Sequence, residues 1–284
     1  QKQRACGVVL FTLGLGLGVY WLAMQYNPET SSAETAAADT GTQSNPVSDP
    51  NSAESSSDGE RHPAFGERTR ERHAMVAMQI AARGVKDQAV LKAMQTVPRH
   101  ALIPGRYQAQ AYADHPLPIG HDQTISQPYI VAFMTEALNL DPNATVLEIG
   151  TGSGYQAAVC AEIARKVYTI EIVNELAKSA RQHLDALGYK NVLAKAGDGF
   201  FGWPEHGPFD AIIGTAAAGR IPPPLLQQLK PNGRMIIPRE EPDGWQHLLL
   251  IAKDKAGSIS TRRILPVRFV PMTGQVENPD SDAD

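Results

Sequence analysis

A strand-like run that enters a glycine-rich turn and leaves it as a helix constrains this chain more than any other feature. Residues 145–149 (Thr-Val-Leu-Glu-Ile) are typical of a buried strand. Gly150, Gly152 and Gly154 follow, and residues 155–164 then favour a helix. Glycines at such a turn let the backbone approach a ligand closely at the end of a parallel strand. The motif therefore predicts a ligand-binding turn in an α/β fold.

Short strand-like and helix-like segments alternate after this turn. The predicted strands span 166–171, 192–196, 209–214 and 234–238. The predicted helices span 174–187, with Asn174 as its N-cap, and 224–229. Because parallel strands need long crossover connections that are usually helical, the alternation predicts a doubly wound, mostly parallel Rossmann-like sheet.

The two ends of the folded region depart from this alternation. Residues 246–253 and 258–270, separated by a turn at 254–257, predict a C-terminal antiparallel hairpin at the sheet edge. Apolar residues at helical spacing over 75–82 and 85–94 predict N-terminal helices that end before Val97-Pro98. We therefore expect helices before the sheet and an antiparallel edge after it.

Composition divides the chain into three parts. Residues 1–26 form a leader, and its residues 5–24 carry no charge. This uncharged stretch is long enough to be a membrane anchor, and Tyr20 and Trp21 lie at its far end. Residues 27–62 hold no Leu, Ile, Met, Phe, Tyr or Trp and therefore predict a disordered acidic linker. Residues 63–284 are expected to form the globular domain.

Charge and cysteine usage exclude several classes of function. The net charge is −4, and the linker alone carries seven acids, so the globular part is close to neutral and offers no basic field for nucleic acid. Two cysteines, Cys6 and Cys160, are too few for a disulfide framework or a zinc site. The histidines show no metal-binding spacing, so we expect no metal.

Three acids follow three successive strands of the predicted sheet. Glu148 precedes the glycine turn, Glu171 ends the next strand, and Asp198 follows the third. A carboxylate at the second strand end can accept both ribose hydroxyls, whereas one beside the glycine turn would repel a pyrophosphate and attract an ammonium group. Tyr155 also stands where a dinucleotide fingerprint has its third glycine. The pattern favours S-adenosylmethionine over a dinucleotide.

The segment before the glycine turn makes the chain resemble the protein-L-isoaspartate O-methyltransferase family, over about residues 72–274. The matching segments are Ala93–Arg99, Pro116–Tyr129, Val146–Tyr155, Gly197–Gly199, Pro208–Ile213 and Val267–Met272. The block Gln123–Pro128 is the most specific of them. Two positions depart from the family pattern: the loop Gly214–Ala218 lacks its usual proline, and Phe200 replaces a frequent Trp or Arg.

The resemblance implies methyl transfer from S-adenosyl-L-methionine to the free α-carboxylate of L-isoaspartyl residues in damaged proteins and peptides. It makes Ser126 the catalytic position, whereas the local sequence Ser-Gln-Pro-Tyr by itself predicts the start of a helix with Ser126 at or near its N-cap. Thr124, Ile125 and Arg268 are expected to bind substrate, and Thr273 to lie near the cofactor. The implied cofactor-binding residues are Gln123, Thr124, Glu148, Gly150, Gly152, Ser153, Gly154, Glu171, Asp198 and Gly199.

Other functions and two locations stay open at this point. The alternatives are a methyltransferase for another carboxylate substrate, a dinucleotide-dependent oxidoreductase, and a membrane-tethered binding protein without turnover. The family resemblance and the supply of cofactor favour the cytoplasm and a monomer. Lys2 and Arg4 before residues 5–24 instead favour a membrane-anchored or exported enzyme.

Overall fold

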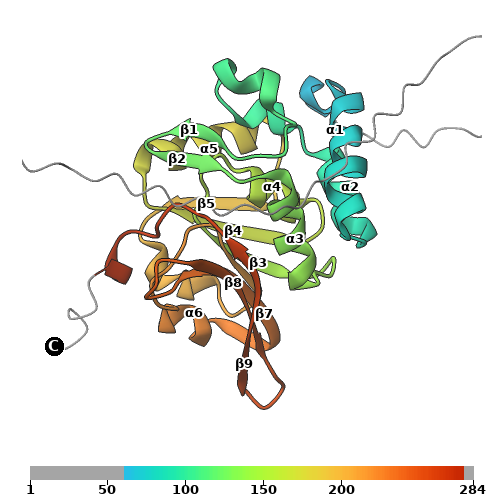
Figure 1. Ribbon diagram of the computed structural model, residues 1–284. Helices are drawn as coiled ribbons and strands as arrows, with labels where there is room; N and C mark the ends of the chain where they lie inside the picture. The colour runs from blue at the N-terminus through green and yellow to red at the C-terminus, as the bar shows by residue number, and fades with distance from the viewer. Residues whose placement is uncertain (1–60, 278–284) are drawn as a thin grey trace, which may run out of the picture. The chain divides into compact units, whose positions relative to one another are not determined.

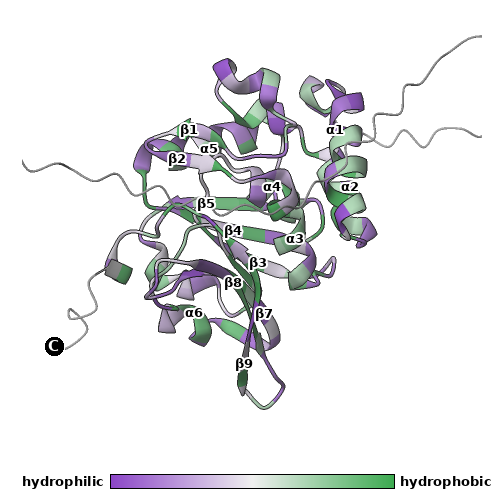
Figure 2. Cartoon of the chain, in the orientation of Figure 1, coloured by the Kyte–Doolittle hydropathy of each residue, from purple (hydrophilic) through white to green (hydrophobic). Residues whose placement is uncertain are grey.

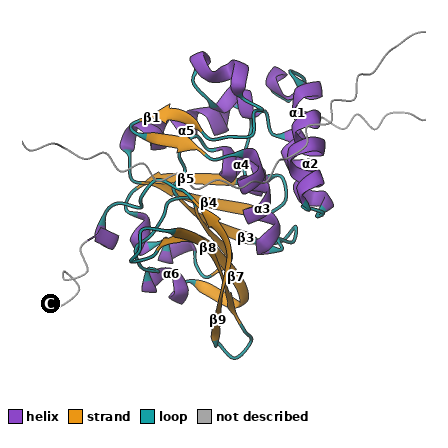
Figure 3. Cartoon of the chain, in the orientation of Figure 1, coloured by secondary structure: helices purple, strands orange, loops and turns teal. Residues whose placement is uncertain are grey.

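The computed structural model describes residues 61–277, which form an α/β unit around a seven-stranded sheet (Figures 1 and 3). The predicted leader and nearly all of the predicted linker lie outside these residues. The strands are β1 Leu117–Gly120, β2 Gln123–Ile125, β3 Thr145–Ile149, β4 Lys166–Glu171, β5 Val192–Ala196, β6 Phe209–Gly214, β7 Leu229–Glu240, β8 Gln246–Lys253 and β9 Ile259–Val267. The α-helices are α1 Thr69–Met75, α2 Gln88–Thr96, α3 Pro128–Leu138, α4 Tyr155–Ala161, α5 Asn174–Ala186 and α6 Pro223–Gln227.

The large sheet has the order β5-β4-β3-β6-β7-β8-β9, and its first five strands are parallel. Strands β8 and β9 pair antiparallel to β7 and to each other. This confirms the predicted Rossmann-like sheet with an antiparallel C-terminal hairpin. The chain reverses direction across the sheet between β3 and β6, so the turns after these strands diverge and leave room for a ligand.

Side chains alternate between the two faces of the sheet and build two separate cores. In β3, Val146 belongs to one core and Leu147 to the other. In β6, Ile213 and Ile212 divide in the same way. Both faces of the central strands are therefore buried, which explains why these strands read as nearly continuous apolar runs.

Three helices cover one face of the sheet. Helices α3, α4 and α5 pack on the parallel strands, and α2 packs against α3 and α4. Figure 2 shows both apolar and polar residues on α2, as expected for a helix with one buried face. The opposite face carries the shorter α6 and the one-turn helix Gly199–Phe201.

Several predicted boundaries are wrong by a few residues, for local reasons. Helix α4 ends at Ala161 instead of 164, and β7 is longer than predicted at both ends. Asn174 is the first helical residue of α5, and the N-cap is Val173, whose backbone N–H donates to the Glu171 carboxylate. No side chain caps α5, because Asn174 is already helical and Val173 has no hydrogen-bonding side chain.

Within residues 61–277, no helix combines the length and the apolar character needed to cross a membrane. The anchor predicted at 5–24 lies outside the described residues.

Candidate active site

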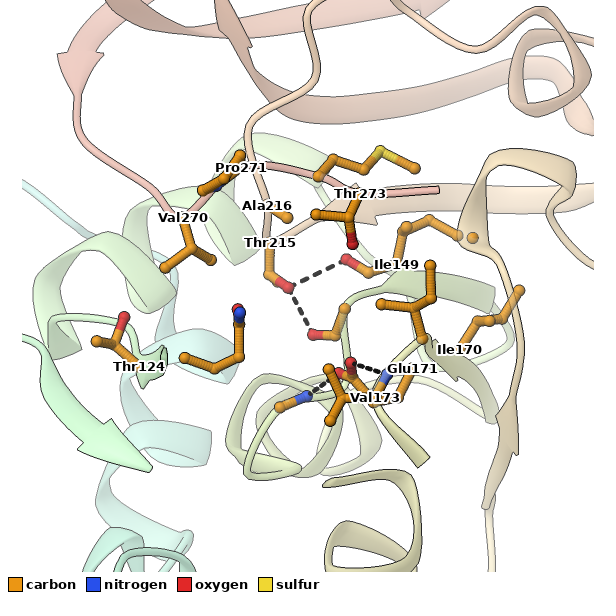
Figure 4. Close-up of a pocket in the computed structure, with 16 residues that line it drawn as sticks. Thr124, Ile149, Ile170, Glu171, Val173, Thr215, Ala216, Val270, Pro271 and Thr273 are labelled. Atoms are coloured by element: carbon orange, nitrogen blue, oxygen red, sulfur yellow. Dashed lines mark hydrogen bonds between the residues drawn. The ribbon is translucent and has the colours of Figure 1, made fainter. Parts of the chain in front are cut away.

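A cavity of about 580 Å³ opens at the carboxyl ends of β3, β4 and β6 (Figure 4). It is lined by the glycine turn, the end of β4, the loop after β6 and the segment that follows β9. The lining residues are Gln123, Thr124, Ile149, Gly150, Gly152, Ile170, Glu171, Ile172, Val173, Gly199, Thr215, Ala216, Val270, Pro271, Met272 and Thr273.

The glycine turn forms the floor of this cavity because no side chain fits there. Gly150 has a φ of +97°, which is strained for any other residue. A Cβ at Gly150 would also lie 2.5 Å from the Thr215 hydroxyl oxygen. Gly154 serves another purpose, since it does not line the cavity and a Cβ there would lie 3.1 Å from Leu184 of α5. The first glycine therefore shapes the site, and the last lets α4 and α5 approach.

Glu171 lies at the end of β4 and is only 5% exposed. Its Oε2 accepts the backbone N–H of Gly152 at 2.7 Å, and its Oε1 accepts that of Val173 at 3.0 Å (Figure 4). These two bonds fix the carboxylate at the rim of the cavity and leave further lone pairs for ligand hydroxyls. The geometry suits the vicinal hydroxyls of a ribose.

Glu148 is fully buried and does not line the 580 Å³ cavity. Its Oε2 accepts the Thr169 hydroxyl at 2.5 Å, and its Oε1 has no hydrogen-bond partner among the described residues. Burial raises the pKa of Glu148 to about 8, and the nearby Glu171 charge adds to the rise, whereas the Thr169 bond partly offsets it. The argument from the sequence assumed an ionised Glu148, whereas burial favours the neutral form of this carboxyl in the free protein.

The charge of the residues that line the cavity is a better argument against a dinucleotide. Among the described residues that line the 580 Å³ cavity, Glu171 is the one acid and there is no Lys, Arg or His. A pyrophosphate site usually relies on helix N-termini and often on basic side chains, whereas an unphosphorylated nucleoside needs neither. The residues present fit S-adenosylmethionine. No cluster of three or more metal-ligating side chains occurs within residues 61–277.

Two further hollows adjoin this cavity. The first, of about 310 Å³, is lined by Glu148, Ser126, Ile125 and Ser153, among others. The second, of about 930 Å³, is an open groove. The β1–β2 ribbon and the start of α3 form one side of it, the end of β9 forms the other, and we call it the substrate groove. Thr124 and Thr215 line all three spaces. These two residues therefore mark the point where the spaces meet.

Ser126 lies between the 310 Å³ hollow and the substrate groove. The N-cap of α3 is Gln127 and Pro128 lies in the first turn, so Ser126 directly precedes the N-cap, near the predicted position, and no side chain makes a capping bond. Pro128 has no N–H, which removes one donor that a cap would satisfy. The Ser126 hydroxyl makes no hydrogen bond to any residue within 61–277. It is therefore available to a ligand.

The remaining predicted residues divide into those at the site and those behind it. Gln123, Thr124, Gly152, Gly199 and Thr273 line the 580 Å³ cavity, as does Gly150. Arg268 lies on the rim of the substrate groove with its side chain exposed. Asp198 lines none of these three spaces, since its oxygens accept the backbone N–H groups of Phe200 at 2.8 Å and Gln275 at 2.7 Å.

Sequence reasoning missed several lining residues, of which Thr215 is the most central. It stands in the loop Gly214–Ala218, where the chain departs from the family pattern, and that departure was the available signal. The segment Val270–Met272 was missed as well, because it reaches the cavity by pairing with Ala217 across the sheet end.

Comparisons with known proteins agree with this geometry. Residues 70–277 match the sequence model of a family described as protein-L-isoaspartate(D-aspartate) O-methyltransferase. A protein-L-isoaspartate O-methyltransferase of Syntrophobacter fumaroxidans is 58% identical over 188 residues, 66% of this chain and 76% of the relative. One of Gloeobacter violaceus is 55% identical over 199 residues, 70% of this chain and 97% of the relative.

Solved structures show the same similarity. A structure of a protein-L-isoaspartate O-methyltransferase superposes with a TM-score of 0.67 at 30% identity, over 72% of this chain and 67% of the other. A structure from Plasmodium falciparum, described as an enzyme of the same name in complex with S-adenosyl-L-homocysteine, has a TM-score of 0.61 at 27% identity, over 71% and 98%.

Proposed function

The chain belongs to the protein-L-isoaspartate(D-aspartate) O-methyltransferase family, and from this membership we propose how its own residues carry out the reaction. The enzyme transfers a methyl group from S-adenosylmethionine to isoaspartyl residues of damaged proteins, which initiates their repair. We assign the cofactor to the 580 Å³ cavity and the isoaspartyl segment to the substrate groove. The α-carboxylate then reaches the junction at Thr124 and Thr215.

The cofactor cavity would hold the nucleoside by its ribose. Glu171, fixed by two backbone N–H groups, accepts the ribose hydroxyls, and the glycine turn lets the rest of the molecule lie against the backbone. When bound, S-adenosylmethionine supplies an electrophilic methyl group on a sulfonium. Asp198 supports this cavity from behind, because it ties the helical turn at Phe200 to the segment at Gln275.

Ser126 orients the substrate carboxylate. An isoaspartyl α-carboxylate is ionised at neutral pH, so its attack needs no general base. What the protein must provide is alignment of one carboxylate oxygen with the methyl group, and orientation alone can contribute several kcal/mol. The Ser126 hydroxyl, which has no partner among the described residues, donates to one oxygen and leaves the other free.

One observation carries this assignment: the 580 Å³ cavity and the substrate groove meet at Thr124 and Thr215 beside Ser126. The test is methyl transfer to two synthetic peptides that differ only in an isoaspartyl or an ordinary aspartyl linkage. We expect fast transfer to the first and little to the second, because the ordinary carboxylate is displaced by one methylene from the aligned position. Equal rates would favour a methyltransferase for another carboxylate.

We also propose that residues 63–284 form the catalytic domain and that residues 5–24 and 27–62 are an address and a tether. The described helices and strands all lie within this region. A chain that begins at Pro63 is expected to keep the turnover of the full chain, and a large loss would make the N-terminal residues part of the enzyme.

We propose a monomeric enzyme in the cytoplasm, where its cofactor is made. The alternative is attachment to, or export across, the inner membrane through residues 5–24. Cell fractionation with protease protection distinguishes the two, since an exported enzyme is digested in intact spheroplasts and a cytoplasmic one is not.

A further inference from the structure

We propose that Thr215 is a positioning residue, which fixes the carbonyl of Gly150 so that it accepts the ammonium group of the cofactor. This inference rests on the proposed function, because it needs S-adenosylmethionine in the 580 Å³ cavity. Neither the glycine motif nor the residues around Ser126 pointed to Thr215, which lies in the loop after β6.

The hydroxyl of Thr215 reaches the glycine turn directly. Its Oγ1 donates to the carbonyl oxygen of Gly150 at 2.5 Å and lies 3.0 Å from that of Ile149 (Figure 4). The backbone N–H of Thr215 also donates to the Ile149 carbonyl at 2.9 Å. Because a hydroxyl has one proton, the short contact to Gly150 is the stronger bond.

The peptide groups around Gly150 are thus held from two strands. The Gly150 backbone N–H donates to the Ile170 carbonyl of β4 at 2.8 Å, and its carbonyl accepts the Thr215 hydroxyl from beyond β6. A carbonyl oxygen has two lone pairs, so the second stays free for a ligand. With both neighbours fixed, this second acceptor direction is fixed as well.

The location of Thr215 indicates which part of the cofactor meets this carbonyl. Glu171, Val173 and Gly199 line the 580 Å³ cavity and neither of the two other spaces, which places the nucleoside at their end of the cavity. Thr215 and Gly150 line both this cavity and the 310 Å³ hollow, and Thr215 also lines the substrate groove. The sulfonium and the amino-acid end must lie on that side, because the methyl group has to face the groove. The ammonium is the donor at that end.

A purely structural role for Thr215 and the positioning role differ in which ligands they affect. If the hydroxyl merely held the loop together, its loss would weaken every ligand of the cavity. If it aims the Gly150 carbonyl, its loss weakens ligands that carry the amino acid and spares the same nucleoside without it. 5′-Methylthioadenosine has the adenosine and the sulfur but no amino acid. S-Adenosylhomocysteine has the adenosine, the sulfur and the amino acid.

The experiment is calorimetric binding of these two ligands to the full chain and to Thr215→Ser and Thr215→Ala. The two variants both lack the methyl group and differ only in the hydroxyl. We expect Thr215→Ala to bind S-adenosylhomocysteine about tenfold more weakly than Thr215→Ser. Binding of 5′-methylthioadenosine is expected to stay within about twofold across the parent and both variants.

Each other outcome overturns a distinct statement. Equal affinity of both variants for S-adenosylhomocysteine, or an equal loss of both ligands in Thr215→Ala, overturns the positioning role. Failure of the parent protein to bind either ligand overturns the cofactor assignment itself. Thr96→Ala, which removes a surface hydroxyl bonded to Lys92, is the control for loss of a threonine, and melting curves verify folding.

Discussion

The two sides of the active site are built in opposite ways. On the cofactor side, Gly150, Gly152, Glu171 and Gly199 lie at the ends of neighbouring parallel strands or in the turns that follow them. The substrate side, which consists of Ser126 and Arg268, combines the segment before α3 with the end of β9, 142 positions later in the sequence. These four residues belong to one continuous supersecondary unit, whereas the substrate side exists only once the whole sheet is complete.

The two sides also differ in how far their polar groups are already satisfied. Both oxygens of Glu171 accept backbone N–H groups. Neither the Ser126 hydroxyl nor the Arg268 guanidinium bonds to another residue within 61–277. Prearranged groups favour tight and specific binding of a constant ligand, and unsatisfied groups are free to bond to a group that arrives with each new substrate. The comparison predicts that changes on the two sides have separable effects.

The largest expected effect lies on the substrate side. Ser126→Ala should lower kcat on an isoaspartyl peptide by about tenfold to a thousandfold, because an oriented donor to the reacting carboxylate is lost. The Kd for S-adenosylhomocysteine should be unchanged within about twofold. Ser260→Ala, on the exposed face of β9, is the matched control. A fully active Ser126→Ala enzyme would remove the catalytic role of this serine.

On the cofactor side, Glu171→Gln should weaken S-adenosylhomocysteine by about tenfold to a hundredfold, since a charged acceptor for the ribose hydroxyls becomes neutral. The kcat at saturating cofactor should change much less. Glu175→Gln, in the exposed first turn of α5, tests for a general effect of charge. If kcat fell while cofactor affinity stayed the same, Glu171 would belong to the substrate side, and the division proposed here would be wrong.

Glu148 lies between the two sides and gives a prediction about stability. Its unfolded pKa is near 4.5 and its folded pKa is about 8, so between these values the folded state binds more protons and stability falls as pH rises. Glu148→Gln should remove this part of the pH dependence. Relative to the parent, its Tm should therefore rise from pH 5 to pH 8, by about 2–4 °C for each kcal/mol involved. A Tm difference that stays constant over this range would contradict a buried neutral carboxyl.

The smallest expected effect is at Arg268. An exposed guanidinium on the groove rim attracts a substrate carboxylate weakly, so Arg268→Gln should raise KM for an isoaspartyl peptide about twofold to fivefold and leave kcat unchanged. Because salt screens the attraction between the two charges, the difference in KM should disappear near 1 M salt. Arg262→Gln, further along the exposed β9, should have no such effect. A large loss of kcat in Arg268→Gln would move this residue from the rim to the reacting centre.

Much of the fold was predictable because its signals are local. The bounds of β3, β4, β5, β6 and β8 agree with the predicted strands, since apolar runs, glycines and prolines mark their ends. The cap of α5 was mispredicted because the helix already includes Asn174, which leaves Val173 as an N-cap without a capping side chain. The length of β7 was mispredicted because pairing with β6 at Leu229 and with β8 as far as Glu240 extends it through polar residues. The extra length of β7 therefore comes from contacts with other elements.

The sequence by itself determined the parallel sheet, the glycine turn and the carboxylate at the end of β4, because each depends on residues within one strand–turn–helix unit. Only the tertiary structure decided what surrounds them. It buried Glu148 so that its carboxyl is mostly neutral, and it brought the hydroxyl of Thr215 to the carbonyl of Gly150. It also left Ser126 without a bond, because Gln127 is the N-cap of α3. A pattern along the chain specifies which groups are present, but protonation and hydrogen bonding depend on neighbours that the fold brings from distant positions.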